Sequence, residues 1–234
     1  MALERHVAPE WLDELPASDW GAIRSRQDLQ RLNFLMGHAG LAARLLKRGG
    51  ASHPIRRVVE LGGGDGTFLL RLARRIVPRA RRFEAMVVDR LGLVSAETRQ
   101  EFTKMGWTLH TTEADIFEWL AQTKPQTGTA MLANLFLHHF EDGQLRALLA
   151  EVERKADLFV ACEPRRAALA LGACRLLGLI GCNAVTRHDA PASVRAGFAR
   201  CELSTLWPSD SCWHLEEGNA GLFSHFLLAR RERP

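Results

Sequence analysis

The chain has 234 residues, of which 47% are hydrophobic and 25% charged, and its formal net charge is +4. This composition is that of an ordinary folded protein and excludes collagen, coiled coils and intrinsic disorder. So small a charge, carried by arginines scattered along the chain, does not indicate a nucleic-acid partner. At this length, one large α/β domain with or without a small appendage is favoured over two independent cores.

The N-terminal residues contain no apolar stretch of the kind found in secretory signals, because charged residues recur between positions 4 and 10. The most apolar stretch, residues 167–180, is interrupted by Arg175 and is shorter than the roughly 20 residues that a membrane span requires. We therefore expect a cytoplasmic protein with no membrane span. The five cysteines form no Cys-x-x-Cys pair, which argues against disulfides and against a metal site.

Residues 20–47 carry apolar side chains at spacings of three and four, which predicts an amphipathic helix that Gly37 and Gly40 kink or divide. A turn signal follows at Gly49 and Gly50, and short apolar runs then alternate with helical stretches. We expect residues 1–52 to form an N-terminal helical cap and residues 53–234 to form an α/β domain.

The apolar runs predict parallel strands buried on both faces, near residues 58–61, 83–89, 107–110, 130–136 and 158–163. Helical patterns separate most of these runs, which indicates repeated βαβ units. The clearest helix follows Asp142, its expected N-cap, and has one apolar face formed by Leu145, Leu148, Leu149 and Val152.

The segment from Arg165 to Arg200 is too long for a plain connection and begins with an apolar helix at residues 167–180. Insertions of this length are commonly functional, so we expect a lid at about 165–200. Two further strands are expected at residues 203–207 and 223–229. The polar, glycine-containing stretch between them suits an antiparallel hairpin at the edge of the sheet.

A glycine-rich loop follows the first predicted strand, in the sequence Val-Val-Glu-Leu-Gly-Gly-Gly-Asp-Gly-Thr of residues 58–67. Backbone without Cβ atoms turns tightly and lets a ligand approach, and the helix that starts near Thr67 offers unpaired N–H groups. The spacing is Gly-x-Gly-x-Gly, not the Gly-x-Gly-x-x-Gly of dinucleotide enzymes. Glu60, two residues before the first glycine, suits a ligand with a cationic amine better than a pyrophosphate.

These residues resemble the class I S-adenosylmethionine-dependent methyltransferases, whose first motif has the form acid-x-Gly-x-Gly-x-Gly. The resemblance covers most of the chain and implies a Rossmann-like fold, with a seven-stranded, mostly parallel sheet and a C-terminal antiparallel hairpin. It also implies S-adenosyl-L-methionine as the cofactor and S-adenosyl-L-homocysteine as the product. Residues 134–140, Asn-Leu-Phe-Leu-His-His-Phe, are most similar to the small-molecule branch with a Leu-His-His-Phe fourth motif.

The resemblance implies cofactor contacts at particular residues. Asp89, at the end of the second strand, matches the acid that accepts two hydrogen bonds from the ribose hydroxyls. Asp115 matches the acid near the adenine, with Ile116 or Phe117 beside the ring, and Asn134 matches the position next to the transferred methyl. The full expected set is Glu60, Gly62, Gly64, Gly66, Asp89, Arg90, Asp115, Ile116 and Asn134.

The acceptor side has three candidate catalytic residues. His138 and His139 follow the fourth strand, and histidine is the expected base if the transfer requires one. We favour His139, with His138 as the alternate, although either one can instead cap a helix or pack under the cofactor. Glu163, which ends the fifth strand, either orients a substrate hydroxyl or pairs with an arginine.

Four further residues are candidates for substrate contacts: Asn33, Arg165, Arg187 and His188. Arg165 follows the fifth strand at the edge where open α/β sheets bind ligands. Arg187 and His188 lie in a polar stretch that suits an acceptor carbonyl, phenolate or carboxylate, and a surface turn is the alternative interpretation.

The leading hypothesis is a methyltransferase that acts on a small hydrophobic molecule, at oxygen, in secondary or quinone-like metabolism. The alternatives are methylation at carbon or nitrogen, a non-catalytic methyltransferase-like partner protein, and an NAD(P)-dependent oxidoreductase. The glycine spacing and the lack of a Tyr-x-x-x-Lys pair disfavour the oxidoreductase. A small-molecule acceptor is the expected partner, and the sequence leaves a homo-oligomer open.

Overall fold

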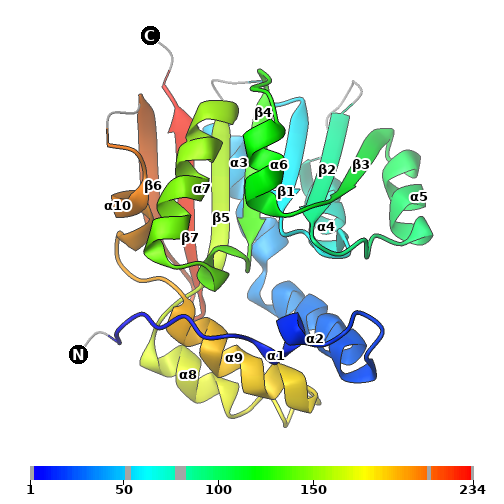
Figure 1. Cartoon of the computed structure of the whole chain (residues 1–234), viewed down its shortest axis with the longest axis vertical. Coiled ribbons are helices and arrows are strands. Elements are labelled where there is room, and N and C mark those ends of the chain that lie inside the picture. Colours follow the sequence, from blue (N-terminus) through cyan, green and yellow to red (C-terminus); the bar gives the residue numbers. More distant parts are fainter. Residues whose placement is uncertain (1–2, 51–53, 77–82, 210–211, 233–234) are drawn as a thin grey trace.

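A computed structural model describes residues 3–50, 54–76, 83–209 and 212–232 (Figure 1). Its centre is a seven-stranded sheet in the order β3-β2-β1-β4-β5-β7-β6. The first five strands in that order pair in parallel, and β7 runs antiparallel to both of its neighbours. The strands are β1 (Arg57–Leu61), β2 (Phe83–Asp89), β3 (Trp107–Glu113), β4 (Thr129–Asn134), β5 (Leu158–Pro164), β6 (Trp213–Ala220) and β7 (Ser224–Arg231). The predicted Rossmann-like methyltransferase fold, with its C-terminal hairpin, is confirmed.

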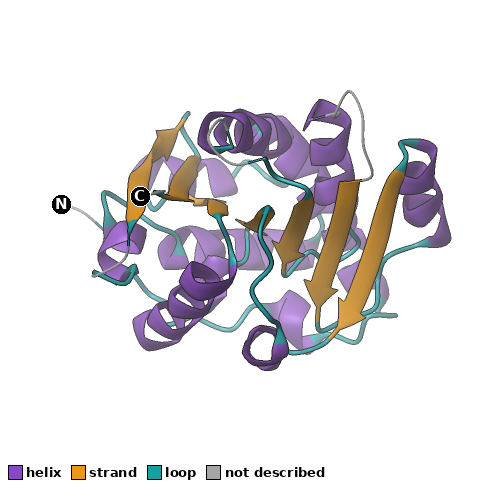
Figure 2. Cartoon of the chain, turned by 90° about the horizontal axis from the view of Figure 1, so that it is seen from above, coloured by secondary structure: helices purple, strands orange, loops and turns teal. Residues whose placement is uncertain are grey.

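Helices cover both faces of this sheet, as the view from above shows (Figure 2). One face packs against α6 (Ile116–Gln122), α7 (Asp142–Lys155) and α10 (Glu202–Leu206). The other packs against α3 (His38–Gly49), α4 (Thr67–Ile76) and α5 (Ala96–Lys104). Because both faces are covered, every residue of β4 and β5 is buried, which explains the continuous apolar runs of these strands.

The expected helix over residues 20–47 is two helices, α2 (Trp20–Met36) and α3. Gly37 separates them in the left-handed conformation, with φ at +70°, and its N–H caps the end of α2. Gly40 lies inside α3 and divides nothing.

The strand expected at residues 203–207 is wrong, because these residues form the short helix α10. Leu203, Leu206 and Trp207 are buried at helical spacings, and the carboxylate of Glu217 accepts hydrogen bonds from the N–H groups of Leu203 and Ser204. The hairpin partner of β7 is instead β6, within the stretch expected to be a loop. As the edge strand, β6 is only partly buried and carries polar residues, so it shows no apolar run.

The N-cap predicted for α7 is also displaced by one residue. Glu141 is the N-cap, and it forms a capping box with Gln144. Asp142 is the first helical residue, and its carboxylate pairs with Arg5 at 2.9 Å.

Four helices lie beyond the carboxyl edge of the parallel strands (Figure 1). They are α1 (Trp11–Glu14), α2, α8 (Ala168–Cys174) and α9 (Ala184–Ala196). We call residues 3–36 and 167–197 the cap. The second of these segments leaves and rejoins the sheet at one place, where Arg165 forms a parallel bridge with Phe198. The division expected between residues 52 and 53 lies at residues outside the described ranges.

None of the described helices is both long enough and apolar enough to cross a membrane.

Candidate active site

The glycine loop connects β1 to α4 at the carboxyl edge of the sheet. Gly62, Gly64 and Gly66 all have positive φ, at +66°, +53° and +72°. A Cβ atom on Gly62 would lie 2.0 Å from the ring of Phe136, whereas a Cβ on Gly64 would point into open space. Gly62 is therefore required by packing, and Gly64 leaves the backbone accessible to a ligand.

Glu60 lies in β1, two residues before the glycine loop begins at Gly62, and its side chain is buried. Burial raises the pKa of its carboxyl well above the usual range, and the negative charges of Asp65 and Asp89 raise it further. Its Oε2 atom has no hydrogen-bond partner among the described residues. Since a buried polar atom without a partner is costly, this oxygen suits a ligand that brings a donor or a positive charge.

Asp89, at the end of β2, is fixed by two backbone donors. Its Oδ2 accepts from the N–H of Gly64 at 2.8 Å, and its Oδ1 accepts from the N–H of Leu91 at 2.9 Å. A carboxylate has about four lone-pair sites, so this geometry leaves capacity on both oxygens for further donors. Arg90 follows with an exposed side chain. Burial raises the pKa of the Asp13 carboxyl, but the hydrogen bond from His139, assisted by the charge of Arg90, lowers it below the usual value.

Asp115 caps α6, because its carboxylate accepts from the N–H groups of Phe117 and Glu118 at 2.8 and 3.4 Å. Ile116 is buried in the core between α6 and the sheet. Phe117 is only partly buried and meets the ring of Phe140 edge-on at 5.4 Å. Of the two side chains expected beside an adenine, Phe117 is therefore the more accessible.

Asn134, at the end of β4, links the sheet to the cap. Its Oδ1 lies 2.7 Å from Nδ1 of the buried His38, and its Nδ2 donates to Asn33 of α2 at 3.2 Å. The other ring nitrogen of His38 contacts the Oγ of Ser224, also at 2.7 Å. Asn134 and Asn33 are thereby held at the place where the cap meets the sheet.

Two cavities adjoin at this edge. The first, of about 170 Å³, is lined by the glycine loop, Glu60, Asn33 and Asn134. The second, of about 390 Å³, is enclosed mainly by apolar side chains of α2, α8, α9 and the turns between the last two helices. Leu29 and Leu135 line both cavities. Leu135 is a non-glycine residue with positive φ, at +52°, directly after β4.

The polar groups of the second cavity are gathered around two histidines. His138 is buried, with its Nδ1 2.8 Å from Oε2 of Glu163 and its Nε2 3.5 Å from Oε1 of Glu10. Burial alone would lower the pKa of His138, but the two carboxylates outweigh it and raise the pKa to about 9. At neutral pH this ring is therefore a cation between two anions.

Glu163 is completely buried and also accepts from the N–H groups of Phe136 and Leu137. Burial raises the pKa of its carboxyl, and the hydrogen bonds from His138 and the backbone more than reverse that effect. Its side-chain partner among the described residues is His138, and not the arginine that was one of the two alternatives expected from the sequence. Glu163 holds His138 and the short 3₁₀ helix Leu137–His139 in place.

His139 differs from its neighbour because it is accessible. Its side chain is 27% exposed, and its Nδ1 lies 3.2 Å from Oδ2 of Asp13. Both histidines line the second cavity, and their ring centroids are 4.3 Å apart.

Asn33 alone, among the four candidate substrate contacts, lines one of the cavities described above. Arg165 donates to the carbonyl of Gly221 at 3.3 Å. His188 stacks on Trp11 with ring centroids 3.6 Å apart, and Arg187 precedes it on α9. His188 holds α1 against α9 and lies away from the cavity walls.

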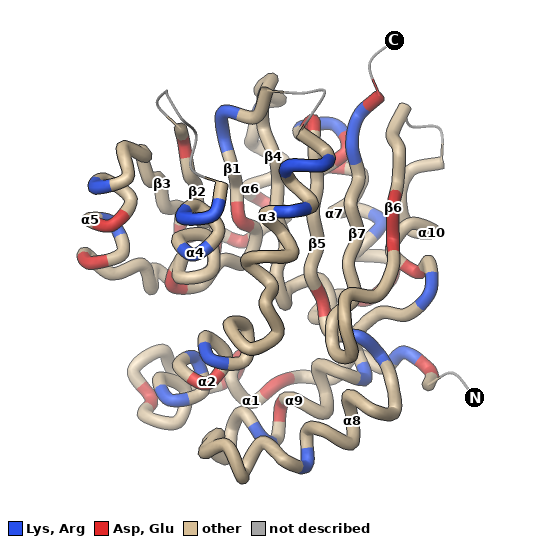
Figure 3. The backbone as a smooth tube through the Cα atoms, turned by 180° about the vertical axis from the view of Figure 1, so that it is seen from behind, with Lys and Arg blue, Asp and Glu red and all other residues tan. Residues whose placement is uncertain are grey.

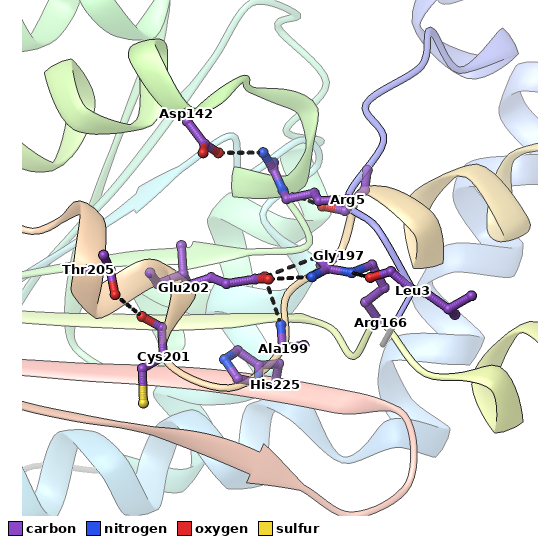
Figure 4. A network of polar contacts seen from close by, with 12 residues as sticks. Leu3, Arg5, Asp142, Arg166, Gly197, Ala199, Cys201, Glu202, Thr205 and His225 are labelled. Carbon is purple, nitrogen blue, oxygen red and sulfur yellow. Dashed lines mark hydrogen bonds and ion pairs between the residues drawn. The ribbon is translucent and has the colours of Figure 1, made fainter. Parts of the chain in front are cut away.

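Glu10 and Asp13 were missed by the sequence analysis. They reach the histidines because the N-terminal segment is anchored across the molecule (Figure 4). Arg166 donates to the carbonyl of Leu3 at 2.7 Å and pairs with Glu202, while Arg5 bonds the carbonyl of Phe140 at 2.7 Å and the carboxylate of Asp142. No sequence pattern marks contacts between residues so far apart.

No family model matches the chain, and no curated protein is detectably similar to it in sequence. Solved structures are similar in fold. An O-methyltransferase family protein from Burkholderia thailandensis matches with a TM-score of 0.62 and 17% identity, over 92% of this chain and 61% of that protein. This chain thus spans about three fifths of that protein's length.

The plantazolicin methyltransferase BpumL, solved with S-adenosylhomocysteine, matches with a TM-score of 0.63 and 11% identity, over 92% of each chain. Human N-acetylserotonin methyltransferase, solved with S-adenosylmethionine, gives 0.51 and 16%, over 94% of this chain and 61% of the human one. At these identities the comparisons show the fold alone, which is that of the class I methyltransferases.

Proposed function

We propose that the protein is an S-adenosylmethionine-dependent methyltransferase that methylates a small hydrophobic molecule at oxygen. One observation carries the proposal: a cavity lined by the glycine loop and Glu60 and a larger apolar cavity adjoin through Leu29 and Leu135. Methyl transfer needs two ligands held end to end, and this arrangement provides a place for each. The solved relatives that contain S-adenosylmethionine or its product support the choice of cofactor.

The residues at the first cavity fit this cofactor. The unpartnered Oε2 of Glu60 suits the ammonium of its methionine part, and the open backbone at Gly64 allows close approach. Asp89 has lone pairs left for the two ribose hydroxyls, and Asp115 with Phe117 would border the adenine. When bound, the cofactor supplies a methyl group already activated on a sulfonium.

On the acceptor side, His139 is the residue that we assign to the acceptor hydroxyl. His138 carries its proton at neutral pH and is enclosed by two carboxylates, so it is poorly suited to accept another proton. His139 faces the same cavity, is partly exposed, and is oriented by Asp13. It accepts or positions the hydroxyl proton while the apolar walls exclude water. Residues 165–200 act as a lid over this pocket.

Calorimetry with S-adenosylmethionine and S-adenosylhomocysteine tests the cofactor. Both are expected to bind, and Asp89→Ala should weaken binding by about tenfold or more, because hydrogen bonds to a charged group are each worth roughly 1.5–3 kcal/mol. Glu232→Ala, which removes the same charge at an exposed position just after β7, at the end of the sheet opposite the glycine loop, should change nothing. Binding of NADH and of neither methyl cofactor would place the chain among oxidoreductases. An NMR spectrum of the product distinguishes methylation at oxygen from methylation at carbon or nitrogen.

A further inference from the structure

The segment that walls the apolar cavity is also apolar on its outer side. Residues 168–181, which comprise α8 and the turns after it, contain a single charged residue, Arg175. Ala170, Ala173 and Leu177 face the cavity. On the outside, Leu169 is 57% exposed and Leu179 is 83% exposed. A helical segment that is apolar on all sides is normally buried on all of them, by protein or by lipid.

The exposed apolar surface continues into the cavity at its mouth. Leu35 of α2, Leu176, Ile180 and Phe223 of the turn between β6 and β7 are all exposed, and all four line the cavity. Leu222 beside Phe223 extends the surface outward. We call residues 168–181, Leu35 and Leu222–Phe223 the docking face.

Within residues 20–40 and 165–188, two of the three segments around the docking face, every exposed charge is positive. Residues 20–40 and 165–188, all of them described, contain seven arginines and one acid. That acid, Asp28, is buried and paired with Arg31. In Figure 3 the tube of α8 itself is tan and blue, without red. The face thus combines apolar side chains with an excess of positive charge.

This combination discriminates between two kinds of cover. A second copy of the chain would bring the same arginines against these, and like charges without counter-ions oppose association. A membrane with anionic lipids supplies acyl chains for the leucines and negative headgroups for the arginines. The charge pattern therefore favours a lipid surface.

We propose that the docking face binds the surface of an anionic membrane, so that the mouth of the apolar cavity opens into the lipid layer. The acceptor then enters from the membrane without crossing water, which makes it a lipophilic molecule dissolved in the bilayer. This last step rests on the proposed function, whereas membrane binding itself does not. The chain lies on the membrane by one face and does not span it.

Co-sedimentation with vesicles tests the docking face. The probes are vesicles of phosphatidylcholine alone and vesicles with about 30% phosphatidylglycerol. The protein should bind the anionic vesicles about tenfold more tightly or better, and less tightly as salt is raised, since salt screens the attraction. Leu179→Glu and Arg175→Glu should each weaken binding by about tenfold. Neither residue lines a described cavity, and an unchanged circular dichroism spectrum and thermal unfolding midpoint serve as the test of folding.

Two variants on α7, Ala147→Glu and Arg146→Glu, match these charge changes at exposed positions of a helix that contributes nothing to the docking face. They should leave vesicle binding within about twofold of the wild type. The proposal is overturned if the wild type fails to bind anionic vesicles, or if the α7 variants weaken binding as much as the docking-face variants. It is also overturned if light scattering shows a dimer that Leu179→Glu dissociates, because the cover is then a second copy.

Failure of this proposal and failure of the proposed function give different results. Vesicle binding with no binding of either methyl cofactor leaves the docking face standing and removes the methyltransferase assignment. Cofactor binding with no vesicle binding overturns the docking face and leaves the methyltransferase assignment standing.

Discussion

Buried apolar side chains hold the sheet and its two helical layers together, whereas the cap is joined to itself and to the sheet largely by polar contacts. In the sheet, Phe159, Leu158 and Leu227 are fully buried. In the cap, the carboxylate of Asp189 accepts from the N–H groups of Trp11 and Leu12 at 2.9 and 3.0 Å, between segments about 180 residues apart in the sequence. Apolar burial is non-directional, whereas a hydrogen bond to a defined backbone group fixes the position of both partners. The polar contacts of the cap therefore contribute more to fixing the positions of its side chains than to the stability of the fold.

The largest expected effect concerns the side chain that the cap places against the sheet. His139→Ala should lower turnover by about 100-fold to 10,000-fold, the range that positioned acid–base groups contribute. Cofactor affinity should remain nearly unchanged, since the glycine loop is untouched. Steady-state kinetics and calorimetry measure the two quantities. His214→Ala, a partly exposed histidine on the edge strand, is the control. Turnover within a few-fold of the wild type would show that alignment alone drives transfer.

In the sheet, Phe159→Ala should lower the free energy of unfolding by about 3–5 kcal/mol, the usual cost of removing a large buried ring. The phenyl group is fully buried, and its centroid lies 5.9 Å from that of Trp207. Denaturant unfolding measures the loss. The exposed Phe34→Ala, on α2, should change stability by less than about 0.5 kcal/mol. Equal effects would contradict the difference between the two regions.

The contact between His138 and its carboxylates predicts a pH dependence of the cap. The folded pKa of His138, about 9, lies above its unfolded value, so its stabilising contribution is complete below about 6.5 and is lost as pH rises through about 9. The pKa values of Glu10 and Glu163 are lowered, so their contribution is present above their unfolded values and lost as the medium is acidified.

The contacts of the N-terminal segment with His138 should therefore be most stable near pH 5 to 6.5 and weaken toward pH 9.5, by the part of the pKa shift that Glu10 and not Glu163 causes. Hydrogen exchange of residues 10–13, corrected for the intrinsic rate at each pH, measures this change. His138→Gln should abolish the alkaline part of the dependence. A wild-type profile that is flat from pH 6 to 9.5 would contradict the assignment.

The smallest effect is expected for a single contact within the cap. Asp189→Ala removes the acceptor of two backbone N–H groups and should cost about 1–3 kcal/mol. Exchange should rise in residues 10–15 and 184–196, with the strands unaffected, because the sheet does not depend on this contact. Asp189→Asn, which keeps one acceptor oxygen, should cost less. If the strands exchange faster as well, the cap and the sheet unfold as one unit.

The sequence predicts the parts of the molecule whose signals are local. The apolar runs give all five parallel strands, and the loop at Gly62–Gly66 with Glu60 and Asp89 is where the spacing places it. The errors lie where local signals mislead. Residues 203–207 have a strand-like composition, but Leu203 to Leu206 belong to helix α10. The strand β6 was not recognised because it contains Glu216, Glu217 and Asn219, and an edge strand need not be apolar.

The acceptor side could be predicted only in part. His138 and His139 belong to a recognisable motif, but their partners Glu10 and Asp13 lie more than 120 residues away, in a stretch with no periodicity. Arg187 and His188 have residue types suited to a ligand, yet they lie on α9, where His188 packs on Trp11. Residue type indicates what a side chain can do, and only the fold decides which neighbour it meets.

The single residue Gly37 connects the cap helix α2 to the sheet helix α3, and this limits how the pocket can open. Because no further linker residues separate the two helices, any rigid-body rotation of α2 relative to the sheet must occur at Gly37. Leu35 lies two residues before Gly37 and would move least in such a rotation. The α2 side of the cavity opening therefore stays nearly fixed relative to the sheet. Under the proposed function, the acceptor would be admitted by movement of the opposite wall, residues 168–181.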